Sequence, residues 1–184
     1  MSDAGGGAQP SRAEFEAAVF PCLEAMFRFA RSLMRGNRAD TEDLVQDAVL
    51  RAFQAFPRFQ PGTNLRAWLF RILRNAYVDL LRKRGRQAEL ADREEALLGG
   101  DRAIEEFRAQ AARERAEAAV EIALARLPGE LRLALLLVDG EGMRYDEVAE
   151  VMDCPVGTVR SRLHRGRRFL RNELLGIWPG RTFP

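Results

Sequence analysis

The sequence is poor in the residues that build metal sites, disulfide frameworks and histidine relays. Its 184 residues include one histidine, His164, and two cysteines, Cys22 and Cys154, which lie far apart and belong to no CxxC pair. A single histidine excludes a site built from several imidazoles, and the isolated cysteines predict reduced thiols in the cytoplasm. We therefore expect neither a metal nor a cofactor.

Long apolar runs are also missing. The longest, Leu133 to Val138, is far shorter than the roughly 20 residues that a membrane-spanning helix needs. The first ten residues have neither a basic start nor an apolar core, so they do not resemble a secretory signal. These absences predict a cytoplasmic protein without membrane insertion, and a disordered tail over residues 1–10.

Lysine is almost absent, because Lys83 is the only one and every other basic residue is arginine. The net charge of +2 indicates no partner by itself, but the charges are unevenly distributed along the chain. A chain of this length, with 47% hydrophobic residues, has room for one medium domain or two small ones with buried cores.

Apolar residues recur at intervals of three and four through most of the chain, with no strand-like alternation and no internal repeat. This pattern predicts an all-α fold of two small helical domains joined by an acidic linker. Ser11 and Glu14 form a capping-box pair, Pro21 should kink or split the first helix, and Asp40 can cap the second. Either Thr63 or Asn64 can cap a third helix that runs to about residue 84.

The second domain ends in a strongly basic helix. Helices are expected over Ala119 to Leu127, from Pro128 to Val138, over Tyr145 to Met152 and from about Pro155 onward. The stretch from Cys154 to Asn172 has six arginines and no acidic residue. Two helices around a tight turn, the second basic, are typical of a helix-turn-helix. The side chains expected to face the major groove are Arg160, Ser161, Arg162, His164 and Arg165.

For both basic helices a simpler explanation is a charged face that only contacts solvent. The coincidence of the acid-free stretch with the second helix of the turn motif favours DNA binding there. The third helix, from about Asn64 to Arg84, has a cationic side bearing Asn75, Asp79 and Arg82, polar groups suited to base edges or a flipped base. Trp68 and the phenylalanines lie at helical spacing and are interpreted as core.

Three segments in the two domains resemble extracytoplasmic-function sigma factors, over roughly residues 15–174. Asp40-Thr-Glu-Asp-Leu-Val-Gln-Asp47 is similar to the region-two helix that docks on the clamp helices of the largest polymerase subunit. The segment from Gly62 to Asn75 is similar to the one that opens the minus-ten element and captures a flipped base. The segment from Tyr145 to Arg168 is similar to the region-four helix-turn-helix that reads the minus-thirty-five element.

The resemblance implies a non-catalytic initiation subunit that directs core RNA polymerase to promoter DNA. It implies region two over residues 11–86, a linker over 87–117, region four over 118–176 and a tail over 177–184.

The implied partners are the clamp helices, the flap of the second-largest subunit, and an anti-sigma factor. The motifs of both domains look closest to the branch that answers thiol-oxidative stress under a zinc-associated anti-sigma factor. The implied polymerase contacts are Asp43, Gln46 and Asp47. The implied DNA contacts are Asn64, Asn75, Asp79, Arg82, Lys83, Thr158, Arg160, Ser161, Arg162, His164, Arg165 and Arg168.

Three other functions remain possible on the sequence alone. A self-sufficient regulator with the same helix-turn-helix would dimerise and bind palindromic operators. A helical protein that binds only proteins, such as a decoy for an anti-sigma factor, would not direct transcription with core polymerase. An enzyme is the weakest alternative, because the sequence has no phosphate loop, metal cluster or nucleophile with a nearby base.

Overall fold

The structure of the chain is a computed structural model that describes residues 11–88, 119–120 and 122–177. Within these ranges the chain forms helices and turns and no strand, which confirms the all-α prediction. None of the helices in these ranges combines the length and the apolar character needed to cross a bilayer. The expected tails at 1–10 and 178–184, and the expected linker from residue 89 onward, lie outside the described residues.

The first helical unit contains α1 (Arg12–Leu33), α2 (Arg38–Ala55), the short 3-10 helix η1 (Phe56–Arg58) and α3 (Leu65–Ala88). The expected capping box is present, since the Ser11 amide donates to Glu14 and the Glu14 amide donates to the Ser11 hydroxyl. The core between the three long helices contains five large side chains that are at most 1% exposed. They are Met26, Phe29, Leu69, Phe70 and Leu73.

Three local expectations for this unit need correction. Of the two outcomes expected at Pro21, a kink or a split, the split does not occur, because α1 continues through the proline with Val19 and Met26 buried. The cap of α2 is Asn37, whose side-chain oxygen accepts the amide of Asp40 at 3.1 Å, so Asp40 lies in the first turn instead. The third helix extends past residue 84 to Ala88, so the expected linker residues 87 and 88 are helical.

The second helical unit contains α5 (Gly129–Leu135), η2 (Leu136–Gly140), α6 (Tyr145–Met152) and α7 (Val156–Ile177). Residues 119–120 and 122–126 before it are helical as well. The expected helix from Pro128 to Val138 widens at its end into the π-type turn η2, in which the Glu141 amide donates to the Leu136 carbonyl at 2.9 Å. Gly142, with φ of +65°, then turns the chain toward α6.

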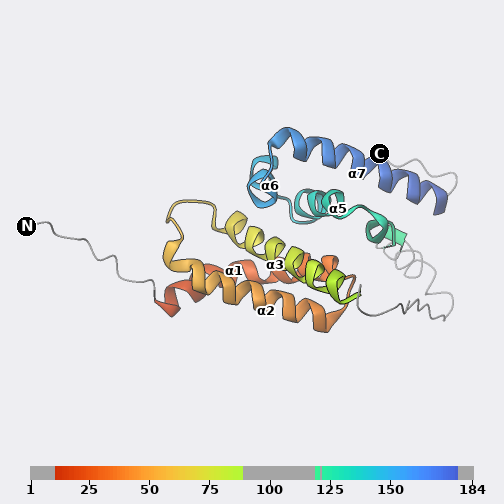
Figure 1. Ribbon diagram of the computed structural model, residues 1–184. Coiled ribbons are helices and arrows are strands. Elements are labelled where there is room, and N and C mark those ends of the chain that lie inside the picture. Colours follow the sequence, from red (N-terminus) through yellow and green to blue (C-terminus); the bar gives the residue numbers. More distant parts are fainter. Residues whose placement is uncertain (1–10, 89–118, 121, 178–184) are drawn as a thin grey trace, which may run out of the picture.

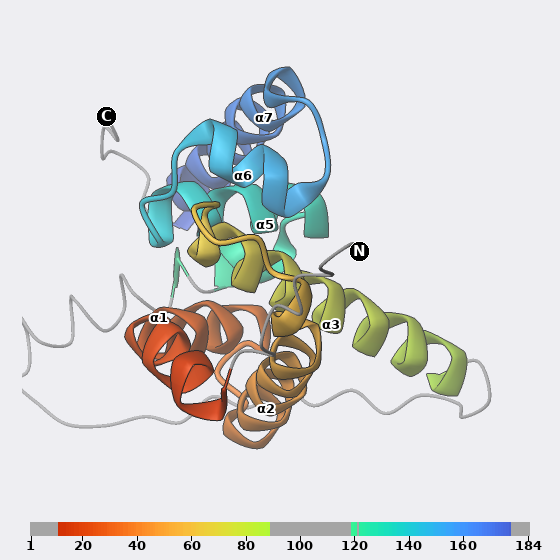
Figure 2. The same ribbon diagram turned by 90° about the vertical axis from the view of Figure 1, so that its left-hand side faces the viewer.

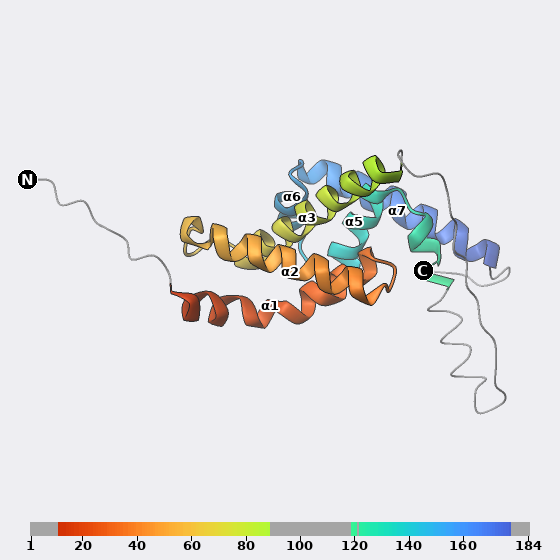
Figure 3. The same cartoon turned by 60° about the horizontal axis from the view of Figure 1, so that its bottom comes forward.

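The two units dock against each other (Figure 1). Contacts join α6 to α3 and η2 to α1, and the buried residues of both units form one continuous cluster. Figure 2 shows α5, α6 and α7 stacked on one side of α1 and α2, with α3 reaching from between the two groups. Figure 3 shows α1 and α2 side by side on the opposite surface. This docked arrangement determines which candidate residues are accessible.

Candidate nucleic-acid interface

The connection between α6 and α7 has the geometry of a helix-turn-helix. Asp153 ends α6 in the left-handed region, with φ of 51°, and the amide of Cys154 donates to the carbonyl of Ala149 at 3.1 Å. The next helix begins directly after Pro155, where a missing amide costs little. The packing that fixes the angle between the helices uses four side chains that are at most 1% exposed: Val148, Val151, Val159 and Leu163.

One face of α7 carries most of the predicted major-groove residues. Its exposed members are Arg160, Ser161, His164, Arg165 and Arg168. They share a face because residues three and four positions apart on a helix are neighbours. Arginine can bind guanine with two hydrogen bonds or pair with a phosphate, so this face can both position and read a duplex. Thr158 lies half-buried in the first turn of the same helix.

Arg162 does not belong to this face. Its side chain is 18% exposed and forms an ion pair of 2.8 Å with Glu130 of α5. It also donates to the sulfur of Cys154 at 3.3 Å. The geometry therefore favours a role in holding α7 against its own domain, contrary to our expectation that Arg162 faces the groove.

A groove of about 350 Å³ runs beside the exposed face of α7. Its lining residues are Tyr145, Arg160, Leu163, His164, Arg167, Arg168 and Arg171. Arg167 was not among the DNA contacts predicted from the sequence. Its guanidinium binds both carboxylate oxygens of Asp139, at 2.6 and 3.1 Å. The hydrogen bonds to this carboxylate raise the pKa of Arg167. Its place in the acid-free stretch, three residues after His164, was the signal that could have identified it.

On α3 the structure brings together the predicted polar residues Asn75, Asp79 and Arg82, since they follow helical spacing and are all exposed. Lys83 is exposed as well. Asp79 accepts a hydrogen bond of 2.6 Å from Arg51 of α2, and Arg51 also binds Asp47. A predicted DNA contact and a predicted polymerase contact therefore share one guanidinium.

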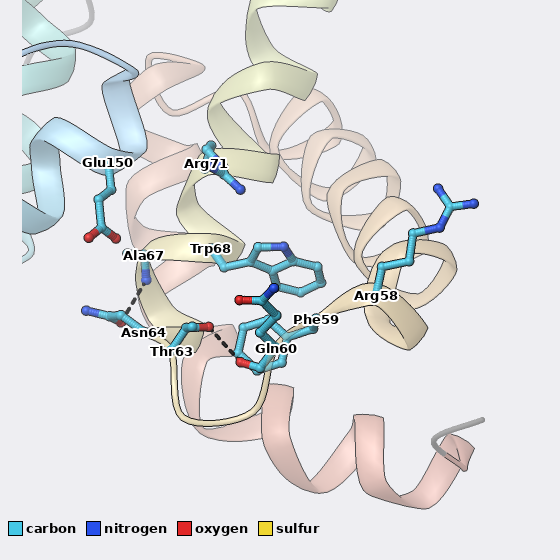
Figure 4. Close-up of a pocket in the computed structure, with 9 residues that line it drawn as sticks. All are labelled: Arg58, Phe59, Gln60, Thr63, Asn64, Ala67, Trp68, Arg71 and Glu150. Carbon is cyan, nitrogen blue, oxygen red and sulfur yellow. Dashed lines mark hydrogen bonds between the residues drawn. The ribbon is translucent and has the colours of Figure 1, made fainter. Parts of the chain in front are cut away.

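The loop before α3 encloses a pocket of about 270 Å³, shown in Figure 4. Its lining residues are Arg58, Phe59, Gln60, Thr63, Asn64, Ala67, Trp68, Arg71 and Glu150. The Thr63 hydroxyl donates to the Gln60 carbonyl at 2.8 Å, which tightens the loop, and the rings of Phe59 and Trp68 lie 5.1 Å apart. Our sequence interpretation of Trp68 as core missed its position on this pocket. An aromatic wall beside polar groups is suited to a base taken out of its stack.

Asn64 has two partners in this structure. Its side-chain oxygen accepts the amide of Ala67 at 3.0 Å, which makes it the cap of α3, one of the two residues expected there. Its side-chain nitrogen donates to the carboxylate of Glu147 on α6 at 2.7 Å. Glu150, one turn further along α6, faces the same pocket (Figure 4). In the docked arrangement two acidic side chains of the second unit thus lie where nucleic acid would approach the first.

Glu141 is the centre of the polar contacts between the two units. Its side chain is 5% exposed and pairs with Arg28 of α1 at 3.1 Å and Arg66 of α3 at 3.4 Å. The backbone carbonyl of Glu141 accepts a further hydrogen bond from Arg66 at 2.6 Å. Because the carboxylate is buried, while Arg28 and Arg66 are 55% and 38% exposed, these contacts are less screened than pairs in which both partners are exposed.

The predicted polymerase contacts lie beside an apolar groove between α1 and α2. Asp43 and Gln46 are exposed, and Asp47 is half-buried in its pair with Arg51. The groove has a volume of about 490 Å³ and is lined in part by Phe27, Leu50 and Phe53, which are 41%, 56% and 45% exposed. Large apolar side chains exposed together indicate a protein-binding surface. Our sequence interpretation placed Phe53 in the core stripe, because helical spacing alone does not show that α1 leaves it uncovered.

Two family models match this chain, one on each helical unit. Residues 22–87 match "Sigma-70 region 2" and residues 118–170 match "Sigma-70, region 4". The first range contains the loop before α3 and α3 up to residue 87, and the second contains the helix-turn-helix.

Relatives match most of the chain. EcfG, an ECF RNA polymerase sigma factor of Rhodopseudomonas palustris, is 42% identical over 82% of this chain and 77% of its own length. SigE of Mycolicibacterium smegmatis is 35% identical over 91% of this chain, which spans 64% of that relative.

Among solved structures, RpoE of Bartonella quintana in complex with the anti-sigma factor NepR has a TM-score of 0.69 at 31% identity, covering 88% of this chain and 96% of that one. CnrH in complex with the cytosolic domain of CnrY has a TM-score of 0.65 at 29% identity, with 89% of each chain covered. This chain belongs to the ECF family of RNA polymerase sigma factors, which are non-catalytic initiation subunits.

Proposed function

We propose that this chain binds core RNA polymerase with the surface around Asp43, Gln46 and Asp47 and reads promoter DNA with two separate elements. The exposed face of α7 contacts the minus-thirty-five element in duplex form. The loop pocket and the exposed side of α3 contact the minus-ten element, with a base in the pocket. The clamp helices of the largest subunit and the flap of the second-largest subunit are the proposed docking sites on polymerase.

The observation that supports this proposal is the presence of two nucleic-acid surfaces on two different helical units. The first has an aromatic-walled pocket and polar residues on α3, and the second has a helix-turn-helix with exposed arginines. A self-sufficient dimeric regulator needs only the second surface. Two weak sites that polymerase holds at promoter spacing gain avidity without any new contact.

The docked arrangement adds a condition to this mechanism. Asn64 is bound to Glu147, so the minus-ten surface becomes fully accessible only when the second unit moves away from the first. Binding to polymerase at two separate places supplies the energy for that separation. Free protein should therefore bind promoter DNA less tightly than the same protein in the holoenzyme, because only the undocked fraction is competent.

The central experiment is transcription in vitro with purified chain, core polymerase and a genomic library, with transcript start sites as the readout. We expect starts at a shared promoter sequence. Arg160→Ala should reduce initiation by about 1–3 kcal/mol if the residue reads a base, with the loss largest at one promoter position. If Arg160 contacts a phosphate, the loss should be uniform and the salt slope smaller by about 0.9.

Arg126→Ala is the matched control for Arg160→Ala, because Arg126 is 65% exposed and lines neither the loop pocket, nor the α7 groove, nor the apolar groove between α1 and α2. It should initiate as the unchanged protein does. Failure of the unchanged chain to associate with core enzyme or to start any transcript would refute the proposal.

We also infer that an anti-sigma factor inhibits this chain, in a cytoplasmic setting. The support is that RpoE and CnrH, with similar folds, are found with NepR and CnrY, and that the apolar groove beside α2 offers a protein-binding surface. A zinc-associated inhibitor released by thiol oxidation stays a prediction from the sequence resemblance. Loss of inhibition on adding a zinc chelator or a thiol oxidant would support that branch, and inhibition unaffected by either would exclude it.

A further inference from the structure

A second cavity lies at the junction of the two units, away from both proposed DNA surfaces. It has a volume of about 300 Å³ and shares no lining residue with the loop pocket or the α7 groove. Its walls come from the end of α1, the short helix at 122–126 and the start of α5. No acidic side chain is among its lining residues, which are Arg28, Arg31, Ser32, Arg35, Gly36, Leu124 and Arg132.

Arg132 is a buried cation without a counter-charge in the described part of the chain. The residue is 7% exposed, its guanidinium donates to the carbonyl of Ser32, and its buried Nε has no hydrogen-bond partner. The pKa of Arg132 is lowered, and burial is the main cause. The nearby Tyr77 acts in the opposite direction, and the charge of Arg35 lowers the pKa further. A buried charge left uncompensated is strongly destabilising, so a site that holds one is suited to an anion.

The other arginines at this cavity increase the positive potential. Arg35 donates only to the backbone carbonyl of Ala125, at 3.2 Å, and Arg31 has no ion pair with any described residue. Arg28 is the exception, because it is shared between Glu24 and Glu141. Three guanidiniums without a carboxylate partner among the described residues therefore border one cavity.

We propose that this cavity is a binding site for a small phosphate-bearing anion. The planar fork of arginine matches phosphate oxygens with two hydrogen bonds, and several forks around one cavity suit a multiply charged group. The volume is at the lower end for small-molecule sites, which fits a phosphate or pyrophosphate group and excludes a folded partner. The anion would contact α1 of the first unit and Arg132 of the second, so its binding would stabilise the docked arrangement. This site does not depend on the proposed promoter contacts.

The test is a titration of the full chain with sodium pyrophosphate at constant ionic strength, followed by calorimetry and by thermal unfolding. We expect saturable binding at one site and a rise in Tm. Arg31→Gln and Arg35→Gln should each weaken binding about tenfold or more, since each removes a charge-assisted hydrogen-bond donor. Both residues are exposed, so these variants should keep their fold, as circular dichroism would show.

Two control variants separate this site from other basic surfaces. Arg12→Gln changes an exposed arginine of the same helix α1, and the double variant Arg160→Gln/Arg165→Gln changes the α7 face. Both should bind pyrophosphate as the unchanged protein does. Amide hydrogen exchange should slow at residues 28–36 and 128–135 together, because the anion bridges the two units. A nucleoside triphosphate that binds more tightly than pyrophosphate would identify a nucleotide as the source of the phosphate.

Three outcomes would overturn the proposal. Binding that never saturates, or that Arg12→Gln weakens as much as Arg35→Gln, would mean an adventitious ion only. Binding lost in the α7 double variant would place the anion on the DNA surface. No binding by the unchanged chain would mean that the cavity does not bind an anion to compensate Arg132. None of these outcomes affects transcription with core polymerase, so the proposed function is judged separately.

Discussion

At the scale of single residues, the arginines of α7 divide into two groups by their partners. Arg160 is exposed and forms no ion pair with a described residue, whereas Arg162 is half-buried against Glu130 and Cys154. The two residues lie two positions apart in one helix, where side chains do not share a face. Sequence reasoning treated both as DNA contacts, because charge in a basic run gives no indication of which arginines turn inward.

We predict that Arg162→Met lowers the free energy of unfolding by about 1–2 kcal/mol, because it leaves Glu130 unpaired while keeping an apolar stem. Arg160→Ala should change it by less than about 0.5 kcal/mol. Urea unfolding measures both values, and duplex binding to a series of single-base promoter variants measures base preference. An Arg162→Met protein of unchanged stability but altered base preference would show that Arg162 reads DNA after all.

At the scale of elements, α7 packs closely against α5 at Gly166. A Cβ built on this buried glycine would lie 2.7 Å from Cδ1 and 3.2 Å from Cγ of Leu135, a side chain that is 3% exposed. Alanine would gain roughly 1 kcal/mol of helix propensity. Overpacking a core contact costs about 1–3 kcal/mol. Since both Leu135 atoms lie in the core, the clash should prevail.

We predict that Gly166→Ala lowers the free energy of unfolding by about 1 kcal/mol, as urea denaturation would measure. The same change in a Leu135→Ala background should cost less, which makes the pair a double-mutant cycle. Gly157→Ala is the control on the same helix, because its Cβ would meet no atom within 4 Å, and it should not destabilise. Equal effects of Gly166→Ala in both backgrounds would mean that the contact with Leu135 is not the cause.

The helices themselves were predictable from the sequence, and their packing was not. Apolar spacing and caps such as Ser11 are local signals, so the all-α class, the helix-turn-helix and most helix limits could be deduced. The contact of Asn64 with Glu147 joins residues 83 positions apart, and such pairs leave no periodic pattern. For the same reason the sequence did not identify the loop pocket as a site with Trp68 in its wall.

At the scale of the whole molecule, the polar contacts that dock the two units centre on one buried carboxylate, beside the continuous apolar cluster that also joins the units. Glu141 pairs with Arg28 and Arg66, and Asn64 with Glu147 lies on the same interface. Glu24 offers a matched comparison, because it also pairs with Arg28, at 3.0 Å, but it lies within α1 and is 88% exposed. Neutralising Glu24 therefore removes one carboxylate partner of Arg28 and leaves the contacts between the two units in place.

We predict that Glu141→Gln raises the undocked population roughly tenfold or more, because Arg28 and Arg66 lose the buried carboxylate that pairs with both of them across the interface. Small-angle scattering should show a larger radius of gyration, and the loop around Asn64 should exchange amide hydrogens faster. Apparent affinity for single-stranded minus-ten DNA should rise in proportion, since affinity scales with the competent fraction. Glu24→Gln should leave all three measurements unchanged. If Glu141→Gln opens the molecule and DNA affinity does not increase, then docking does not mask the pocket, and Glu147 and Glu150 lie beside it without blocking DNA.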